Sequence, residues 1–164
     1  MKPLDPFLKY SLQLAERARA NGNHPFGALL VYQGQVIATA ENTVISDQDI
    51  TAHAEMNLIR KAFKDLPRQN LKSTVLYSNT EPCAMCSGAI YWAGIGSVVF
   101  GCSNRTLSEI VGGSLEIPCR EILRHGKKVH KIIGPVNENH FKKIHEEFWI
   151  ADEEAGNVDF LQRS

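Results

Sequence analysis

Two short segments of the chain, Thr51-Ala-His-Ala-Glu55 and Thr80-Glu-Pro-Cys-Ala-Met-Cys86, decide how the rest of the sequence is read. Each segment stands where the pattern predicts the start of a helix. The first opens a helix over residues 52–62, and Pro82 in the second opens a helix that ends near Gly94. The segments therefore place the imidazole of His53, the carboxylate of Glu55 and the thiols of Cys83 and Cys86 at helix starts, and these four side chains are the candidate site.

The two cysteines, Cys83 and Cys86, are three positions apart and share one face of a helix. Their thiols can therefore bind one metal ion, and a helix N-terminus favours the thiolate form that binds metal. The imidazole of His53 supplies a third ligand. Three protein ligands leave the fourth tetrahedral position open, which is typical of catalytic zinc, where bound water ionises with a pKa of about 7.

Glu55 follows His53 by two residues, an offset of roughly 200° in the middle of a helix, which would point the two side chains apart. Both side chains reach one site only if the metal lies off the start of the helix. Glu55 then sits beside the bound water without being a ligand. We expect it to be the catalytic residue that moves protons between water, substrate ring and leaving amine.

Other interpretations fit each half of the pattern taken alone. A Cys-x-x-Cys pair often forms half of a structural zinc site or a redox pair, and a His-x-Glu pair is common by chance. No second pair is available here, because Cys102 and Cys119 are far apart in the sequence. The two halves together, in this order and each at a helix start, favour a catalytic metal site.

Along the rest of the chain, predicted strands alternate with predicted helices. Asp5-Pro6 opens a helix that continues to Asn21-Gly22. Further helices are expected at residues 118–125 and around residues 141–149, and strands at residues 28–31, 36–40, 74–77, 97–100 and 129–133. The opening strand pair looks antiparallel, so the pattern predicts an α/β fold with a mixed sheet covered on both faces.

The bulk composition is that of an ordinary globular domain. Hydrophobic residues make up 43% and charged residues 22% of 164 residues, and the formal net charge is zero. We expect a single domain over residues 1–164, with no signal peptide, no membrane span and a cytoplasmic location. A neutral chain has no overall electrostatic attraction to nucleic acid.

At these segments the sequence resembles the cytidine/deoxycytidylate deaminase superfamily, whose signature is H-x-E followed by P-C-x-x-C. The resemblance runs from Pro25-Phe-Gly-Ala28 through Phe100-Gly101. Residues 25–28 and 89–93 are similar to bacterial guanine deaminases, and residues 95–101 are similar to tRNA adenosine deaminases. The resemblance to this superfamily implies a three-layer α/β/α sandwich with a five-stranded sheet, one Zn²⁺ per chain, and a homodimer or higher oligomer.

The resemblance also implies that Asn42 hydrogen-bonds the substrate ring, although a cap for the following loop is an equal local interpretation. We further expect Phe26, Ala54, Glu81 and Trp149 to contact the substrate, Trp149 as an apolar cover. Guanine deaminases of this type carry acidic residues in two places where this sequence has Ser114 and Lys143. Glu116 offers a substitute, so guanine as the substrate is left open.

Several other residues have a simpler interpretation. Trp92 and Phe148 are expected to pack in the core or in a dimer, and His24 is expected to be an incidental loop residue. His140 and His145 are read as surface or partly packed residues. The basic run at residues 125–131 is either a phosphate contact or, more commonly, a solvated helix end.

The sequence therefore favours hydrolytic deamination of a free nucleobase or related aminated heterocycle, with a guanine-like purine first. Cytosine, isocytosine, an aminotriazine or a nucleoside are alternatives. A second alternative is adenosine-to-inosine editing of tRNA, under which nucleic acid would be a partner. A non-catalytic zinc-binding module is the third, and Glu55 argues against it.

Overall fold

The computed structural model describes residues 4–65, 67 and 71–154, with side chains described up to residue 150. Among the described residues, the strands are β1 (Gly27–Tyr32), β2 (Gln35–Glu41), β3 (Thr74–Thr80), β4 (Ser97–Cys102) and β5 (Lys131–Ile133). The helices are α1 (Pro6–Ala20), α2 (Val44–Asp47), α3 (Ala54–Asp65), α5 (Ala84–Ala93), α6 (Asn104–Val111), α7 (Cys119–Arg124) and α8 (Glu138–Glu154). No described helix is long and apolar enough to cross a membrane.

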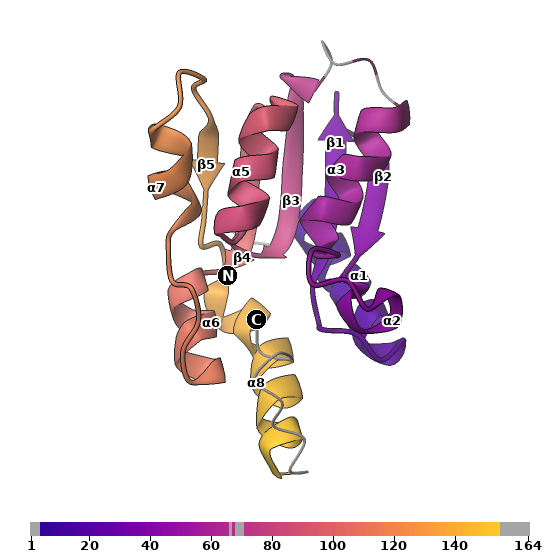
Figure 1. The fold of residues 1–164 in the computed structure, drawn as a ribbon, viewed down its shortest axis with the longest axis vertical. Coiled ribbons are helices and arrows are strands. Elements are labelled where there is room, and N and C mark those ends of the chain that lie inside the picture. Colours follow the sequence, from indigo (N-terminus) through magenta and orange to yellow (C-terminus); the bar gives the residue numbers. More distant parts are fainter. Residues whose placement is uncertain (1–3, 66, 68–70, 155–164) are drawn as a thin grey trace.

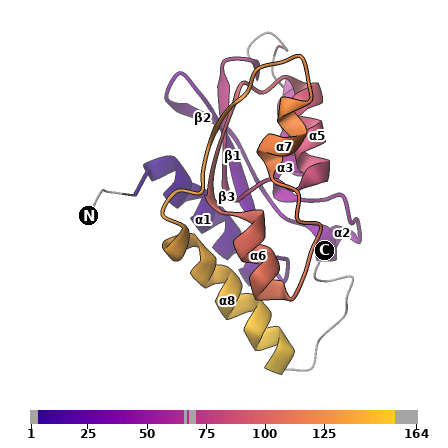
Figure 2. The same ribbon diagram turned by 90° about the vertical axis from the view of Figure 1, so that its left-hand side faces the viewer.

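The five strands form one mixed sheet in the order β2-β1-β3-β4-β5. β1 pairs antiparallel with both β2 and β3, whereas β3, β4 and β5 run parallel. The predicted mixed five-stranded sheet is confirmed. Helices α3, α5 and α7 cover one face of this sheet, and α1 and α8 cover the other, as Figures 1 and 2 show.

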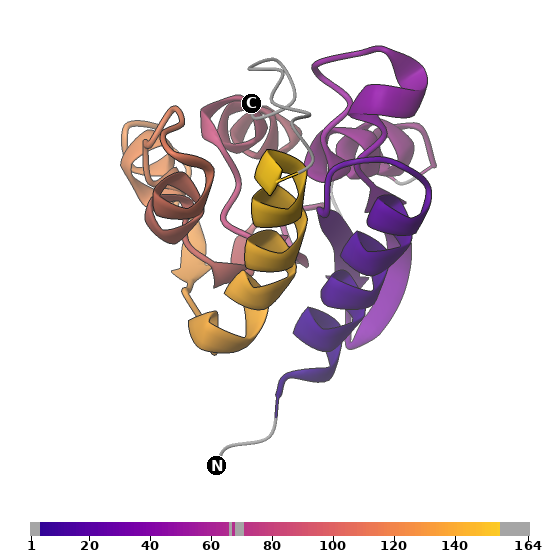
Figure 3. The same cartoon turned by 90° about the horizontal axis from the view of Figure 1, so that it is seen from below.

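The side chains of β1 show why two helical layers are needed. Leu30 packs toward α3 and its neighbours, while Leu29 and Val31 pack on the side of α1, because successive residues of a strand point to opposite faces. Both sets are buried. The predicted three-layer α/β/α sandwich is therefore confirmed, and Figure 3 shows α1 and α8 side by side in one outer layer.

The helix boundaries follow local capping chemistry. Asp5 caps α1 by accepting hydrogen bonds from the backbone amides of Phe7 and Leu8, as Asp5-Pro6 predicted. Gly94 ends α5 in the left-handed conformation, with φ at 79°.

Two helices were not expected from the sequence. Helix α2 is a single turn. Helix α6 begins after Ser103, whose hydroxyl accepts from the amide of Thr106. Its apolar residues Leu107, Ile110 and Val111 follow helical spacing, so the pattern for this helix was present in the sequence and was missed.

Candidate active site

The three predicted ligand side chains converge between the start of α3 and the start of α5, two helices in the same layer (Figure 1). His53 lies one residue before α3, Cys83 is the residue that precedes α5, and Cys86 lies in the first turn of α5. Nδ1 of His53 is 3.7 Å from Sγ of Cys83 and 3.7 Å from Sγ of Cys86. All three ligand atoms lie within 4.8 Å of one another.

These separations fit a tetrahedral zinc site. With zinc–sulfur and zinc–nitrogen bonds of about 2.3 and 2.0 Å, nitrogen and sulfur ligands stand roughly 3.5 Å apart. The observed value of 3.7 Å is close to that figure. The residues present therefore fit a zinc ion with three protein ligands, and among the described residues these are the three that could hold a metal ion.

The electrostatics of the two thiols are unequal. The hydrogen bond from Cys86, assisted by one from His53, lowers the pKa of Cys83 to about 4 despite its burial. The same hydrogen bond and burial raise the pKa of Cys86 well above its ordinary value. The pair therefore presents one ready thiolate, Cys83, at the start of a helix.

Glu55 lies beside the ligand cluster in the first turn of α3 and is buried. Its Oε1 accepts a hydrogen bond of 2.7 Å from the hydroxyl of Ser78, and its Oε2 accepts one of 3.6 Å from the thiol of Cys86. Burial raises the pKa of this carboxyl, while the Ser78 hydroxyl acts in the opposite direction. The side chain sits next to the ligands as expected from a metal placed off the helix start.

Ser78 was missed by the sequence reasoning, although a signal was present. Along β3, Leu76 and Ser78 share the face that packs toward α3, and Leu76 belongs to the main core. A hydroxyl at a position that should be apolar indicates a polar partner across the layer, and that partner is Glu55.

Two further predicted site residues are Asn42, in the loop after β2, and Ala54, next to the ligand His53 in the sequence. Both are buried. The Asn42 Oδ1 accepts a hydrogen bond of 3.1 Å from the amide of Val44, so the side chain does cap the loop that follows β2. Its contact with a substrate stays a prediction. Ala54 is the first residue of α3, directly between His53 and Glu55.

A group of rings joins the loop before β1 to helix α8. His24 lies 5.1 Å from Trp149 and 6.2 Å from Phe148 between ring centroids, and Phe26 lies 5.2 Å from His145. Burial, assisted by the nearby positive charge of His53, lowers the pKa of His24 to about 4. The ring group therefore borders the metal ligands.

This arrangement corrects two expectations. His24 is not an incidental loop residue, because it is buried among the rings. His145 is not a surface residue, because it is fully buried and its Nε2 lies 2.7 Å from the Thr80 hydroxyl. Trp149 is buried too, so it forms part of the packed wall here. Its contact with a substrate, like that of Phe26, stays a prediction.

The loop that carries His24 and Phe26 is held to β3 by the buried side chain of Asn79. The Asn79 Oδ1 accepts from the amide of Gly27 at 2.9 Å, and its Nδ2 donates to the carbonyl of Pro25 at 3.1 Å. Gly27 is required here because a Cβ would overlap the backbone of α1. This contact was not predicted from the sequence.

Glu81 stands in the loop between β3 and α5 and is nearly buried. Both of its carboxylate oxygens accept from backbone amides, Oε2 from Asn104 and Oε1 from Cys119. The carboxylate thus has partners within the protein, and its predicted contact with a substrate stays a prediction.

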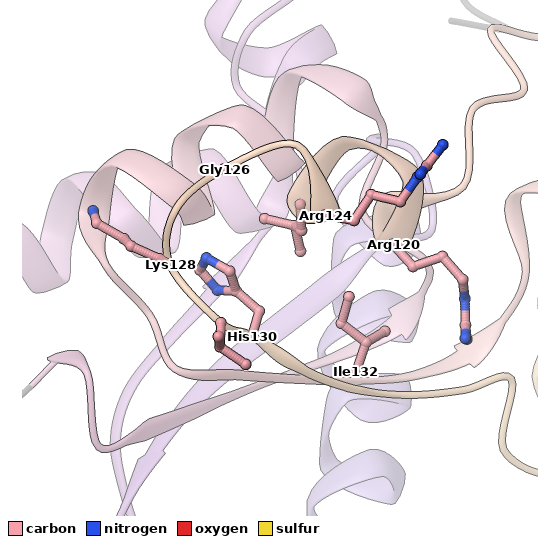
Figure 4. Close-up of a pocket in the computed structure, with 8 residues that line it drawn as sticks. Arg120, Arg124, Gly126, Lys128, His130 and Ile132 are labelled. Carbon is pink, nitrogen blue, oxygen red and sulfur yellow. The ribbon is translucent and has the colours of Figure 1, made fainter.

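The basic run at residues 125–131 lies away from the metal ligands. Together with α7 it borders a hollow of about 420 Å³ (Figure 4), lined by Arg120, Leu123, Arg124, Gly126, Lys128, Val129, His130 and Ile132. Lys128 donates to the carbonyl of Tyr91 near the end of α5, whereas Cys83 precedes its start. Ten helical residues span about 15 Å, so the hollow lies at the other end of this helix.

The cations around this hollow do not converge on one point. Arg124 pairs with Glu121, Lys128 with Tyr91, and Arg120 donates to the carbonyl of Gly134. Figure 4 shows Arg120 and Lys128 at opposite ends. The solvated-helix-end interpretation of the basic run fits this placement better than a phosphate contact.

Comparison with known proteins agrees with this geometry. Residues 1–102 match the family model described as the cytidine and deoxycytidylate deaminase zinc-binding region. The chain is 34% identical over 148 residues to a probable cytosine deaminase of Schizosaccharomyces pombe, covering 87% of this chain and 90% of that protein. It is 42% identical over 106 residues to the guanine deaminase of Bacillus subtilis, covering 64% and 68%.

A solved structure from a study of A-to-I editing by tRNA:A34 deaminases has a similar fold. Its TM-score is 0.69 at 28% sequence identity, covering 84% of this chain and 97% of that chain. The similar proteins thus carry three different deaminase activities on one fold.

Proposed function

This chain belongs to the cytidine and deoxycytidylate deaminase family of zinc-dependent hydrolytic deaminases, and from that premise we propose that its substrate is a free nucleobase. The observation that carries the proposal is the convergence of His53, Cys83 and Cys86 beside the buried carboxylate of Glu55. A wall of packed rings borders that cluster.

Different residues of the site bind the metal and transfer protons in the proposed deamination. His53, Cys83 and Cys86 hold the zinc ion, which when bound lowers the pKa of the attacking water to about 7. Ser78 holds Oε1 of Glu55, which leaves Oε2, on the side of the ligands, to exchange protons. Glu55 takes one proton from the attacking water and delivers it to the ring nitrogen as the water oxygen bonds to the ring carbon. It then takes the second proton, from the hydroxyl group that the carbon has gained, and delivers it to the amine. The carbon–nitrogen bond breaks, ammonia leaves, and the hydroxyl becomes the carbonyl of the product.

The position of Glu55 suits both halves of that proton transfer. A general base works best when its pKa lies near the working pH, and burial moves the pKa of this carboxyl upward toward that range. As a carboxylate it takes a proton from water, and as a carboxylic acid it returns one to the amine.

A free base is favoured over tRNA by charge. A protein that grips folded RNA neutralises several phosphates with lysine and arginine. This chain has a formal net charge of zero, and its basic hollow lies at the far end of α5 from the ligands. Binding of a small neutral ring depends instead on buried apolar faces and a few hydrogen bonds, which the ring group and Asn42 supply.

Among free bases, a guanine-like purine is the first candidate and cytosine the second. The segments at residues 25–28 and 89–93 support guanine, as does the 42% identity to the guanine deaminase. Cytosine is supported by the extent of the match to the probable cytosine deaminase, which covers 87% of the chain against 64%.

The test is ammonia release from guanine, cytosine, isocytosine, adenine, an aminotriazine and the matching nucleosides, alongside inosine formation in tRNA, across a salt series. We expect turnover of at least one free base with little dependence on salt. Editing of tRNA that weakens steeply with salt, without turnover of any base or nucleoside, would show that the proposed substrate is wrong.

A homodimer is part of the same proposal. Trp92 is 79% exposed at the end of α5, so it does not pack in the monomer core. Of the two expected places for Trp92, packing against a second copy of the chain is the one that is left.

A cytoplasmic location is supported by the four cysteines, all of which are described and free of disulfides. A zinc site with two thiolates works best in a reducing compartment.

A further inference from the structure

The loop that carries the ligand Cys83 is tied to two distant parts of the chain. Residues 81–83 connect the end of β3 to α5. The carboxylate of Glu81 accepts hydrogen bonds from the amide of Asn104 at 3.0 Å and from the amide of Cys119 at 2.8 Å. These two amides are the first of α6 and of α7, so one side chain holds the starts of both helices against the loop.

Three more hydrogen bonds complete this network. The amide of Glu81 donates to the carbonyl of Cys102 at 2.7 Å. The carbonyl of Pro82, the residue directly before the ligand, accepts from the Ser87 hydroxyl at 3.1 Å and from Nδ2 of Asn104 at 3.3 Å. Asn104 therefore binds both the carboxylate of Glu81 and the backbone of the loop.

Breaking a hydrogen bond of this network destabilises the folded protein. Glu81, Ser87 and Asn104 are all at least nine-tenths buried, so a polar group that loses its partner there is not compensated by water. The loop backbone cannot move without breaking several of these bonds together. Since one rotatable bond, Cα–Cβ, places the Cys83 sulfur, the position of that backbone limits the sulfur to three staggered positions.

We propose that Glu81 is a positioning residue for the metal centre, which holds Cys83 at its distance from His53 and Cys86 by anchoring the loop to α6 and α7. This role concerns zinc affinity and goes beyond the choice of base. It also gives the buried carboxylate a function that needs no contact with the substrate.

A graded pair of variants tests the role. Glu81→Gln offers one acceptor oxygen where the two amides need two, and Glu81→Ala offers none. Zinc affinity is measured by competition with a chelator, and the absorption spectrum of the cobalt-substituted protein reports the thiolate ligands. We expect zinc affinity to fall by about tenfold in Glu81→Gln and further in Glu81→Ala, within the range typical of residues that orient metal ligands.

The matched control is Glu138→Gln. The Glu138 carboxylate accepts from the amide and the hydroxyl of Ser103, one residue from Asn104, but it anchors α8 and does not touch residues 81–83. It should lower thermal stability while leaving zinc affinity and the cobalt spectrum unchanged. The control thus separates loss of stability from loss of ligand placement.

Two results would overturn the proposal. If both Glu81 variants keep wild-type zinc affinity and cobalt spectra while losing stability as Glu138→Gln does, Glu81 is only a structural tie. If zinc affinity is unchanged but KM for the base rises in zinc-saturated enzyme, Glu81 is a substrate contact. If Glu81→Ala does not fold, the zinc affinity and cobalt spectrum of Glu81→Gln alone decide whether the proposal holds. The zinc-affinity and cobalt measurements do not depend on which base is the substrate, so the proposal can fail while the proposed function stands, and the reverse.

Discussion

Ser78 donates a hydrogen bond of 2.7 Å to Oε1 of Glu55, and both side chains are buried between β3 and α3. This bond opposes the rise in the pKa of Glu55 that burial causes. It therefore keeps the carboxylate available as a base and fixes which of its oxygens faces the ligands.

The first prediction removes that bond. Ser78→Ala raises the pKa of Glu55 further, so the acidic limb of the pH profile of kcat/KM should move to higher pH. We expect kcat to fall by about tenfold, less than the loss of at least about 10² expected for Glu55→Gln with zinc retained. Ser78→Thr keeps the hydroxyl and is the control. An acidic limb that stays in place in Ser78→Ala would contradict this role of the hydroxyl.

The second prediction concerns the metal ligands. Cys83→Ala and Cys86→Ala should each lose most of the bound zinc, because two protein ligands hold the ion far more weakly than three. The buried thiols of Cys102 and Cys119 are the controls, and their serine variants should keep one zinc per chain by metal analysis. Full zinc occupancy in Cys83→Ala or Cys86→Ala would refute the ligand assignment.

The third prediction separates the two roles open to Asn42. Asn42→Asp keeps the oxygen that caps Val44 but loses the amide donor, whereas Asn42→Ala loses both. If the amide contacts the base, kcat/KM should fall by about 10² or more in both variants, with the thermal midpoint lowered chiefly in Asn42→Ala. Normal turnover by Asn42→Asp would leave Asn42 as a loop cap only.

The fourth prediction follows from the burial of His145, which lowers its pKa to about 3. In the unfolded chain this histidine binds a proton below about pH 6.5. Between about pH 6.5 and 3 the unfolded state therefore binds a proton at His145 that the folded state does not bind. As a result, the free energy of unfolding falls as the pH drops from about 6.5 toward 3. Its contribution to the slope is at most about 1.4 kcal/mol per pH unit.

His145→Gln removes this titration while keeping a polar group for Thr80. Urea unfolding at pH 7 and pH 5 should show a smaller loss of stability on acidification in the variant than in the wild type. The exposed His140 of the same helix is the control, and His140→Gln should behave as the wild type. An unchanged difference in His145→Gln would mean that His145 accepts a proton in the folded state.

The fifth prediction tests the proposed dimer. Trp92→Glu places a charge at the exposed end of α5 and should convert a dimer into monomers, as measured by light scattering during gel filtration. Tyr10→Glu, on α1 in the opposite layer, is the control and should leave the mass unchanged. A wild-type monomer, or a Trp92→Glu dimer of wild-type strength, would exclude this face.

The ligand set was readable from the sequence because the spacing of Cys83 and Cys86 on a helix is itself the geometry that a metal needs. The sheet was readable because alternating apolar segments have few ways to bury both faces. Both inferences depend on neighbours along the chain.

The rest of the site depends on neighbours across the fold. Ser78 contacts Glu55 and Glu81 contacts Asn104 only when β3 is in place between its layers. The hydroxyl of Ser78 on an apolar strand face indicates that a polar partner exists, but no local pattern identifies that partner. The histidines were misjudged for the same reason. In sequence His24 looks like an incidental loop residue and His145 like a surface or partly packed one, yet the packing of α8 against the loop before β1 buries both.

The Asn79 side chain, which bonds the backbone of the loop at Pro25 and at Gly27, has a consequence for how this site can evolve. Because Asn79 bonds only the backbone of the loop, an exchange of the side chains at positions 24 and 26 leaves these two hydrogen bonds in place. If Phe26 contacts the substrate as proposed, selection for a new substrate can act on that position one substitution at a time. Libraries for enzyme engineering should vary position 26 while keeping Gly27 and Asn79 constant.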